Sequence, residues 1–159
     1  MEAHRIWKFG NDVDTDQIIP SQYLLLPSAQ AMKSHTFETL NPDFASRVKP
    51  GDVIVAGKNF GCGSSREQAP LVLKALGVSA VIAGSFARIF FRNSINIGLP
   101  LIVCPELHDQ LAESDSLAFS LGKGEIVYKG RTFHFPRFPE HIQKIIDHGG
   151  LVGYLNASK

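Results

Sequence analysis

The feature that most limits how this chain folds is a short apolar run that leads directly into a glycine-rich turn. Asp52–Ala56 is apolar after its first residue, Gly57–Gln68 carries three glycines, and Ala69–Leu76 has apolar residues at helical spacing. This order predicts a strand, a turn and a helix. The free N–H groups and the positive dipole end at a helix start favour a bound anion. Because two serines and an arginine occupy Ser64–Arg66, the sequence predicts a carboxylate or phosphate site with a serine placed to react there.

Apolar runs and helical stretches alternate through the middle of the chain. The runs are Val53–Ala56, Val78–Ala83 and Leu101–Val103, and the helical stretches between them are Glu67–Leu76 and Arg88–Ile97, each ending at a glycine. Strands that are apolar throughout and separated by helices are typical of parallel βαβ units with right-handed crossovers. The sequence therefore predicts an α/β fold, in which ligands bind at the carboxyl ends of the strands.

The N-terminal part of the chain precedes this alternating region. His4–Phe9 has the composition of a first strand, and Asp12–Asp16 is predicted to be a loop because its acidic residues alternate. A short helix is expected through Arg47, with Asn41 as its cap and Pro42 at its first helical position.

The C-terminal third has a different character. Glu125–Tyr128 and Arg131–Phe135 flank a Lys129–Gly130 turn, which predicts a hairpin, and Pro139–Asp147 predicts a last helix. The length of 159 residues suits one domain over residues 1–159 that buries a substantial core.

Charge and composition exclude several classes of function. The net charge of +1, from 16 basic and 15 acidic residues, gives no excess of positive charge that would bind nucleic acid or an anionic membrane surface. No apolar run approaches the roughly 20 residues that span a bilayer, and we expect a cytoplasmic protein. Cys62 and Cys104 are too few for a disulfide framework or a four-thiolate metal site, so an iron–sulfur cluster would need ligands from another chain.

The serines of the turn have two interpretations. Ser64 and Ser65 are each followed three residues later by Glu67 or Gln68, and either pair satisfies the capping-box pattern. One cap needs one hydroxyl, however, and no cap needs Arg66 or the nearby glycines. A cationic surrounding that excludes water would let a serine act as an alkoxide, and this excess of polar groups favours chemistry.

Familiar anion and metal motifs do not fit. Lys58 comes before the later glycines, unlike the lysine of a P-loop, and Arg66 stands where a dinucleotide fingerprint needs glycine. Asp12–Asp16 has aspartates at alternate positions, as the first part of an EF-hand calcium loop does. Gln17 and Tyr23, however, occupy the positions of the loop's glycine and its bidentate glutamate. Asp12 and Asp14 suit turn chemistry, whereas Asp16 either shares that role or orients a catalytic group.

Four further features have a structural and a functional interpretation. Ser85 is a candidate cap for the second crossover helix, and Arg88 faces either the ligand edge or solvent. Cys62 lies beside a helix start, where a thiol pKa falls, but no histidine is near it in sequence. Tyr23–Pro27 is an apolar run in a polar region, either buried in the core or serving as an apolar wall for a substrate.

Three segments together resemble the family of 3-isopropylmalate dehydratase small subunits, which is similar to the swivelling domain of aconitase. The matching stretches are Gly10–Pro20, Gly57–Pro70 and Ser85–Pro100. Their order and spacing make the resemblance specific, and they cover roughly the first hundred residues. Beyond Cys104 the resemblance is one of length and layout.

The resemblance implies a swivelling β/β/α domain that closes over a large subunit carrying a [4Fe-4S] cluster. In such enzymes the cluster iron binds the hydroxyl and a carboxylate of a small dicarboxylate substrate as a Lewis acid. A serine alkoxide of the small subunit removes the proton from carbon, water leaves, and rehydration at the neighbouring carbon completes the isomerisation.

The family's residues map onto this chain by position. The base falls on Ser64, with Ser65 and Arg66 holding a substrate carboxylate and Asp16 supporting them. Arg88 is a further substrate-binding candidate because of its place at the start of the second crossover helix, not because of the resemblance. The residues and the resemblance thus indicate the same site.

The sequence departs from two related families at one place. Aconitase has a further substrate-binding arginine after its aspartate motif, and homoaconitase subunits have an arginine where this chain has Leu25. An apolar side chain suits the isopropyl group, because a buried carboxylate facing leucine would be desolvated without a partner. We therefore expect isopropylmalate in leucine biosynthesis, with a homoaconitase, citraconate or methylmalate type of dehydratase as alternatives.

A competing hypothesis of another class is a non-catalytic anion-binding module whose serines only cap a helix. The sequence leaves open whether the isolated chain forms a homo-oligomer. We also expect the loop Tyr23–Phe37 to be mobile, because a cover over an active site belongs to the weakly held parts of a fold.

Overall fold

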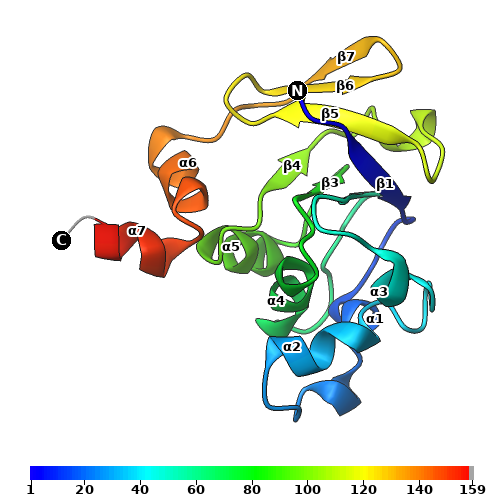
Figure 1. Ribbon diagram of the computed structural model, residues 1–159, viewed down its shortest axis with the longest axis vertical. Helices are drawn as coiled ribbons and strands as arrows, with labels where there is room; N and C mark the ends of the chain where they lie inside the picture. The colour runs from blue at the N-terminus through cyan, green and yellow to red at the C-terminus, as the bar shows by residue number, and fades with distance from the viewer. Residues whose placement is uncertain (158–159) are drawn as a thin grey trace.

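A computed structural model, which describes residues 1–157, contains one seven-stranded mixed sheet (Figure 1). The strand order is β4-β3-β2-β1-β5-β6-β7. The first four strands are parallel, and the last three join the free edge of β1 in antiparallel order. The strands are β1 His4–Lys8, β2 Val53–Ala56, β3 Ala80–Ala83, β4 Leu101–Val103, β5 Ser116–Ser120, β6 Glu125–Tyr128 and β7 Arg131–His134.

Helices α4 and α5 connect β2 to β3 and β3 to β4, as expected of βαβ units, whereas α6 and α7 follow the hairpin of β6 and β7 (Figure 1). The α-helices are α1 Thr15–Ile18, α2 Ala29–Met32, α3 Phe44–Arg47, α4 Gln68–Ala75, α5 Arg88–Asn96, α6 Glu140–Asp147 and α7 Leu151–Ala157, with 3₁₀ turns at Ser21–Tyr23, Lys33–His35 and His108–Gln110. No helix of residues 1–157 is long and apolar enough to cross a bilayer.

Two hydrophobic clusters cover opposite faces of the parallel strands. Ile54 of β2 and Val81 of β3 belong to the cluster that also holds Leu73 of α4, so the crossover helices cover this face. Val55 and Ile82 belong to the other cluster, which contains residues of the antiparallel strands. Successive side chains of a strand point to opposite faces. Strands buried on both faces are apolar at every position, as the sequence shows.

The predicted α/β class is confirmed, as are the first strand, the three parallel strands of the βαβ units, both crossover helices, the hairpin and helix α6. The hairpin turns at Lys129 and Gly130, which both have positive φ values, 48° and 76°. Two expected elements differ. Asp12–Asp16 is not a simple loop, because helix α1 begins at Thr15. The predicted cap of α3 at Asn41 is wrong, because Asp43 is the residue that precedes the helix.

Strand β5 and helix α7 were not expected from the sequence. Strand β5 has one exposed, one buried and three half-buried residues, and it pairs with β1 at His4–Leu117 and Arg5–Ser116. It therefore closes the edge of the parallel sheet opposite β4.

Candidate active site

Three chain segments that follow strands β1, β2 and β3 lie side by side at the carboxyl ends of these strands. The Asp12 amide donates to the Lys58 carbonyl at 2.8 Å, and the Phe60 amide donates to the Ser85 carbonyl at 3.0 Å. Two parallel bridges, Asp14–Cys62 and Phe60–Phe86, continue the strand order past the sheet itself. The glycine-rich turn is therefore held between the segments that the resemblance selected.

Gly61 makes this close packing possible. Its φ value is +84°, and a Cβ atom added there would collide with the ring of Phe90 on α5. Its amide donates to the Val13 carbonyl at 2.7 Å. Only glycine adopts this backbone conformation without cost while allowing the ring to approach.

Ser64 and Ser65 are both exposed and do not cap helix α4. Helix α4 begins at Gln68, the preceding Glu67 has helical dihedral angles, and no side chain caps this helix. The capping interpretation of the two serines is therefore wrong. Both serines instead line a pocket of about 210 Å³, whose lining residues are Thr15, Gly61, Gly63, Ser64, Ser65, Arg66, Ala87, Arg88, Ile89, Phe90 and Asn93.

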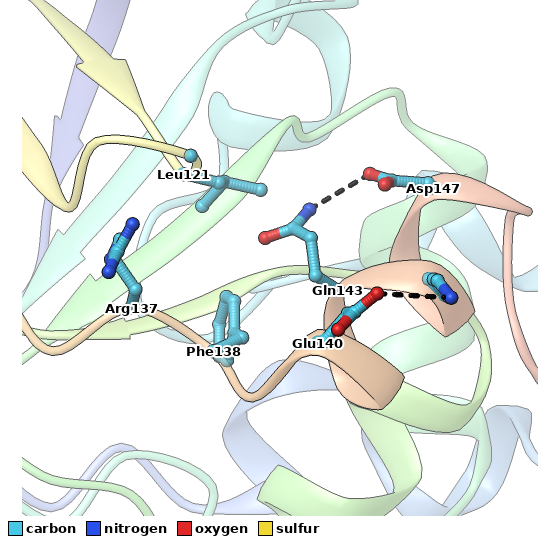
Figure 2. A pocket seen from close by; sticks show the side chains of 8 residues that line it. Leu121, Arg137, Phe138, Glu140, Gln143 and Asp147 are labelled. Atoms are coloured by element: carbon cyan, nitrogen blue, oxygen red, sulfur yellow. Dashed lines mark hydrogen bonds and ion pairs between the residues drawn. The ribbon is translucent and has the colours of Figure 1, made fainter.

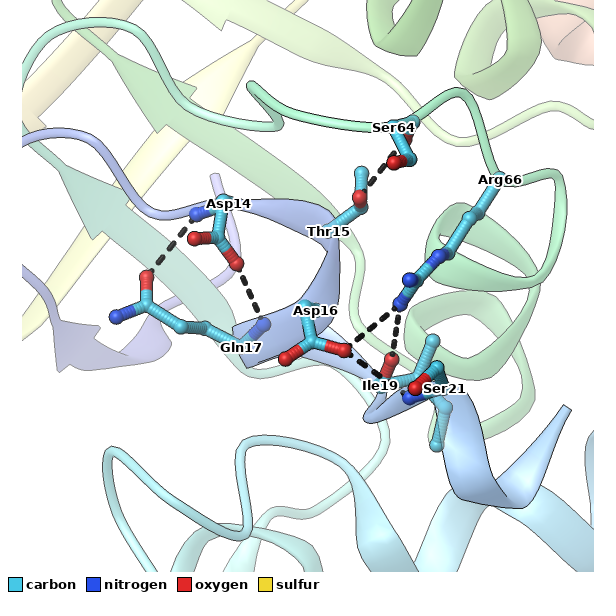
Figure 3. Close-up of polar contacts among 8 residues, drawn as sticks. All are labelled: Asp14, Thr15, Asp16, Gln17, Ile19, Ser21, Ser64 and Arg66. Atoms are coloured by element: carbon cyan, nitrogen blue, oxygen red, sulfur yellow. Dashed lines mark hydrogen bonds and ion pairs between the residues drawn. The ribbon is translucent and has the colours of Figure 1, made fainter.

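Arg66 is fixed at this pocket by helix α1 and the residue after it (Figure 3). Its Nη1 donates to Oδ1 of Asp16 at 3.1 Å and to the Ile19 carbonyl at 3.1 Å. The Arg66 side chain is 16% exposed and that of Asp16 is 63% exposed. The hydrogen bond from Arg66, followed by that from the Ser21 amide, holds the pKa of Asp16 below its ordinary value. Asp16 is not among the residues that line the pocket, and its side chain is joined to the pocket by the hydrogen bond from Arg66.

Helix α1 also contacts the backbone of Ser64. The hydroxyl of Thr15 donates to the Ser64 carbonyl at 2.7 Å, and the Thr15 amide donates to the Cys62 carbonyl at 2.9 Å. Thr15 is 2% exposed. Sequence reasoning missed this residue, although it lies next to Asp16 in the first matching motif.

The start of helix α5 forms the opposite side of the pocket. Arg88 is exposed in the first helical turn and lines the pocket, together with Ile89 and Asn93, which sequence reasoning missed. Residues four apart share a helix face, so the spacing of Ile89 and Asn93 was the available signal. The predicted cap at Ser85 is wrong, because Ala87 precedes the helix and the Ser85 hydroxyl accepts from the Asn59 amide at 2.8 Å.

The apolar run after helix α1 is divided between core and solvent. Tyr23, Leu24 and Leu26 are half-buried against the core, so the core interpretation is confirmed for them. Leu25 is 95% exposed and is not among the residues that line the pocket. Its role as a substrate wall stays a prediction.

Neither thiol is activated. Burial, with the nearby Asp14 and Asp12 carboxylates, raises the pKa of Cys62, which opposes a nucleophilic role. Burial and the hydrogen bond to Glu106 raise the pKa of Cys104 to about 12. Within residues 1–157 no group of three or more His, Cys, Asp or Glu side chains is arranged to hold a metal ion. The described residues thus do not fit an iron–sulfur cluster bound by this chain alone.

A larger hollow of about 670 Å³ lies between Leu121 and helix α6 (Figure 2). Four of its polar side chains are paired with one another, and Arg137 also lines it. Gln143 donates to Asp147 at 2.8 Å, and Lys144 forms an ion pair with Glu140 at 3.2 Å. Among the described residues, the hollow holds carboxylates beside its cations and no serine, whereas the smaller pocket combines Ser64 and Ser65 with two arginines and no carboxylate, so the smaller pocket is the stronger candidate for an anionic substrate.

Comparisons with known proteins identify the family to which the chain belongs. The chain matches the family described as the aconitase C-terminal domain over residues 26–106. The 3-isopropylmalate dehydratase small subunit of Methanosarcina acetivorans is 51% identical over 152 residues, which cover 94% of this chain and 93% of the relative. The isopropylmalate/citramalate isomerase small subunit of Methanocaldococcus jannaschii is 50% identical, over 95% of this chain and 91% of the relative.

A solved structure gives the same result for the fold. The crystal structure of a 3-isopropylmalate dehydratase from Methanocaldococcus jannaschii matches with a TM-score of 0.92 and 46% identity, over 98% of this chain and 93% of that chain. The resemblance that three motifs indicated is thereby confirmed. The chain belongs to the family of 3-isopropylmalate dehydratase small subunits, within the larger group that shares the aconitase C-terminal domain.

Proposed function

We propose that this chain is the small subunit of a hydro-lyase that interconverts 2-isopropylmalate and 3-isopropylmalate by dehydration and rehydration. The observation that carries the proposal is the exposed Ser64 in a pocket with Arg66 and Arg88. Relatives of nearly full length are named for this reaction, which supports the assignment. The resemblance assigns the Lewis-acid contribution to a [4Fe-4S] cluster of the large subunit.

Ser64 is the proposed base. Its oxygen, as an alkoxide, takes the proton from a substrate carbon, and the electron pair left behind forms a carbon–carbon double bond as the hydroxyl leaves the adjacent carbon. Water then adds with the hydrogen and hydroxyl positions exchanged. An alkoxide forms only where positive groups stabilise it and water is excluded. Arg66 and the free amides before helix α4 supply the charge, and closure against the large subunit would exclude the water.

The two sides of the pocket suit two parts of the proposed substrate. Ser65 and Arg66 on the turn are placed to bind one carboxylate, and Arg88 the other. Arginine suits carboxylates because its planar N–H groups match both oxygens. Ile89, together with the other apolar lining residues, offers a surface for the alkyl branch. Leu25 would complete this surface when the segment that carries it closes over the pocket.

The name of the Methanocaldococcus relative makes citramalate, a methylated malate, the second candidate substrate. Both acids carry two carboxylates and an apolar branch, and they differ in the size of that branch. Comparing kcat/KM for the two acids in one assembled enzyme separates the candidates. A preference for isopropylmalate supports the proposal, and a preference for citramalate favours the alternative.

The direct test mixes the purified chain with a cluster-bearing large subunit and follows the ultraviolet absorbance of the unsaturated intermediate. Ser64→Ala should lower kcat by at least about 1,000-fold, as removal of a catalytic nucleophile or base does in other enzymes. Gel filtration should show unchanged association. Ser46→Ala is the matched control, because Ser46 is exposed on α3 and bonds only its local backbone. Full turnover by Ser64→Ala would favour the non-catalytic anion-binding module.

A further inference from the structure

We infer that Thr15 is a positioning residue for Ser64, and that helix α1 orients the reactive turn through two separable contacts. This inference rests on the proposed function. Thr15 holds the backbone of the proposed base, whereas Asp16 holds the side chain of the proposed carboxylate-binding residue, Arg66. The two neighbouring residues should therefore affect different kinetic constants.

The contact of Thr15 is made at the residue that carries the reacting atom. Thr15 Oγ1 lies 2.7 Å from the Ser64 carbonyl oxygen, and its amide lies 2.9 Å from the Cys62 carbonyl oxygen. Thr15 is buried, whereas Gly63, Ser64 and Ser65 are all exposed. Gly63 has a φ value of +89°, and because glycine has no Cβ atom to restrict its dihedral angles, the turn depends on its neighbours to hold this conformation. The Thr15 hydroxyl supplies that hold.

Helix α1 is held firmly in place despite its short length, so it can support these contacts. The Asp14 carboxylate accepts from the Gln17 amide at 2.8 Å, and the Gln17 side chain accepts from the Asp14 amide at 3.0 Å. This reciprocal capping box closes the single turn. Ile18 and Ile19 are fully buried, which fixes the turn to the core.

The second contact leaves the same helix in a different direction. In Figure 3, Thr15 points toward Ser64, and Asp16 points toward the guanidinium of Arg66. Displacing the backbone of a base lowers the rate of proton transfer, and a shift of about 1 Å costs up to about 100-fold. Freeing an arginine that binds the substrate weakens binding in ground and transition states alike, which raises KM.

A role in stability alone is the competing explanation for Thr15. The Ser64 carbonyl belongs to an exposed residue, so water would replace the lost hydrogen bond at little cost in folding. Thr15→Val keeps the shape and removes the donor, whereas Thr15→Ser keeps the donor and removes a methyl group. The pair separates the hydroxyl from the packing of the side chain.

The experiment uses the enzyme assembled with its large subunit and isopropylmalate as substrate. Thr15→Val should lower kcat by about 10- to 100-fold with KM changed less than about threefold, and Thr15→Ser should recover most of the lost kcat. Thr15→Ala is a second variant without the donor, to be used if the valine variant does not fold. Asp16→Asn should instead raise KM with a smaller effect on kcat.

Two results would overturn the inference. One is a normal kcat in both variants that lack the donor, and the other is an equal loss of kcat in Thr15→Ser and Thr15→Val. Either result, with an inactive Ser64→Ala, leaves the proposed function standing and removes only the role of Thr15. Full activity of Ser64→Ala would instead overturn the proposed function itself.

Discussion

Nη1 of Arg66 lies 3.1 Å from Oδ1 of Asp16, a residue 50 positions earlier in the chain. The same nitrogen donates to the Ile19 carbonyl, so one guanidinium joins the glycine-rich turn to the segment after β1. This contact leaves the rest of the guanidinium available for a carboxylate, because arginine has five N–H donors. Asp16 therefore orients Arg66 without neutralising its use as a binding group.

The first prediction concerns the pH dependence of this ion pair. Its carboxylate has a pKa below the ordinary value of 3.8, so it contributes at any pH above that value and is lost only as pH falls through the lowered pKa. Asp16→Asn should therefore raise KM about 5- to 10-fold, or about 1–1.4 kcal/mol, the usual net contribution of one hydrogen bond, and equally at about pH 6 and pH 8. Steady-state kinetics at both values test this. An effect confined to one of them would contradict the assigned role.

The second prediction concerns substrate choice at Leu25. Leu25→Arg should reduce turnover of isopropylmalate, because a charged side chain near the alkyl branch would be desolvated without a partner. Leu40→Arg is the matched control, since Leu40 is another exposed leucine. The measurement is kcat/KM of the assembled enzyme. Unchanged turnover in Leu25→Arg would show that this residue is not a substrate wall.

The third prediction concerns motion in the segment Tyr23–Phe37. The Tyr23–Met32 part is made of single helical turns with local hydrogen bonds and only partial burial before Met32, so its turns open at lower cost than the core. The Phe37 amide donates to the Ile18 carbonyl at 2.9 Å, and Phe37 is fully buried. Hydrogen exchange should therefore be fast in the first part and slow at Phe37. Uniform protection across the segment would contradict a mobile cover.

The fourth prediction concerns an unsatisfied hydroxyl at Thr36. Among the described residues, its Oγ1 is buried and has no hydrogen-bond partner. Thr36→Val keeps the shape and removes the polar atom, so it should raise the free energy of unfolding by about 1 kcal/mol. Thr39→Val, at an exposed position, should change it little. Urea unfolding of both variants tests this, and a loss of stability in Thr36→Val would mean that the hydroxyl is bonded in solution.

The fifth prediction concerns stability at alkaline pH. The Cys104 thiol has a pKa of about 12 in the folded chain against an ordinary value of 9.0. Its folded pKa is raised, so its contribution is complete below about pH 9 and is lost as pH rises toward 12, by at most about 1.4 kcal/mol per pH unit. Urea unfolding of the chain and of Cys104→Ala across this range isolates the effect. Parallel curves for the two proteins would contradict the raised pKa.

Local patterns identified most of the central sheet and its helices. The runs at Val53–Ala56 and Leu101–Val103 are apolar because both faces of each strand are covered, and a run of consecutive apolar residues can be recognised in the sequence. Strand β5 was not predicted because its alternation of polar and apolar residues is weak, and because it pairs with β1, which lies more than a hundred residues away in the sequence. Pairing between distant segments leaves no local signal.

The residues of the candidate site were identifiable from the sequence, but the contacts that hold them were not. The sequence by itself determined that Ser64, Ser65 and Arg66 follow a buried strand and precede a helix, because hydrophobic period and glycine placement are local properties. Only the tertiary structure decided that these serines do not cap the helix, and that Thr15 and Asp16 contact the turn. A hydroxyl bonds the nearest available partner, and which partner is nearest depends on how distant segments pack.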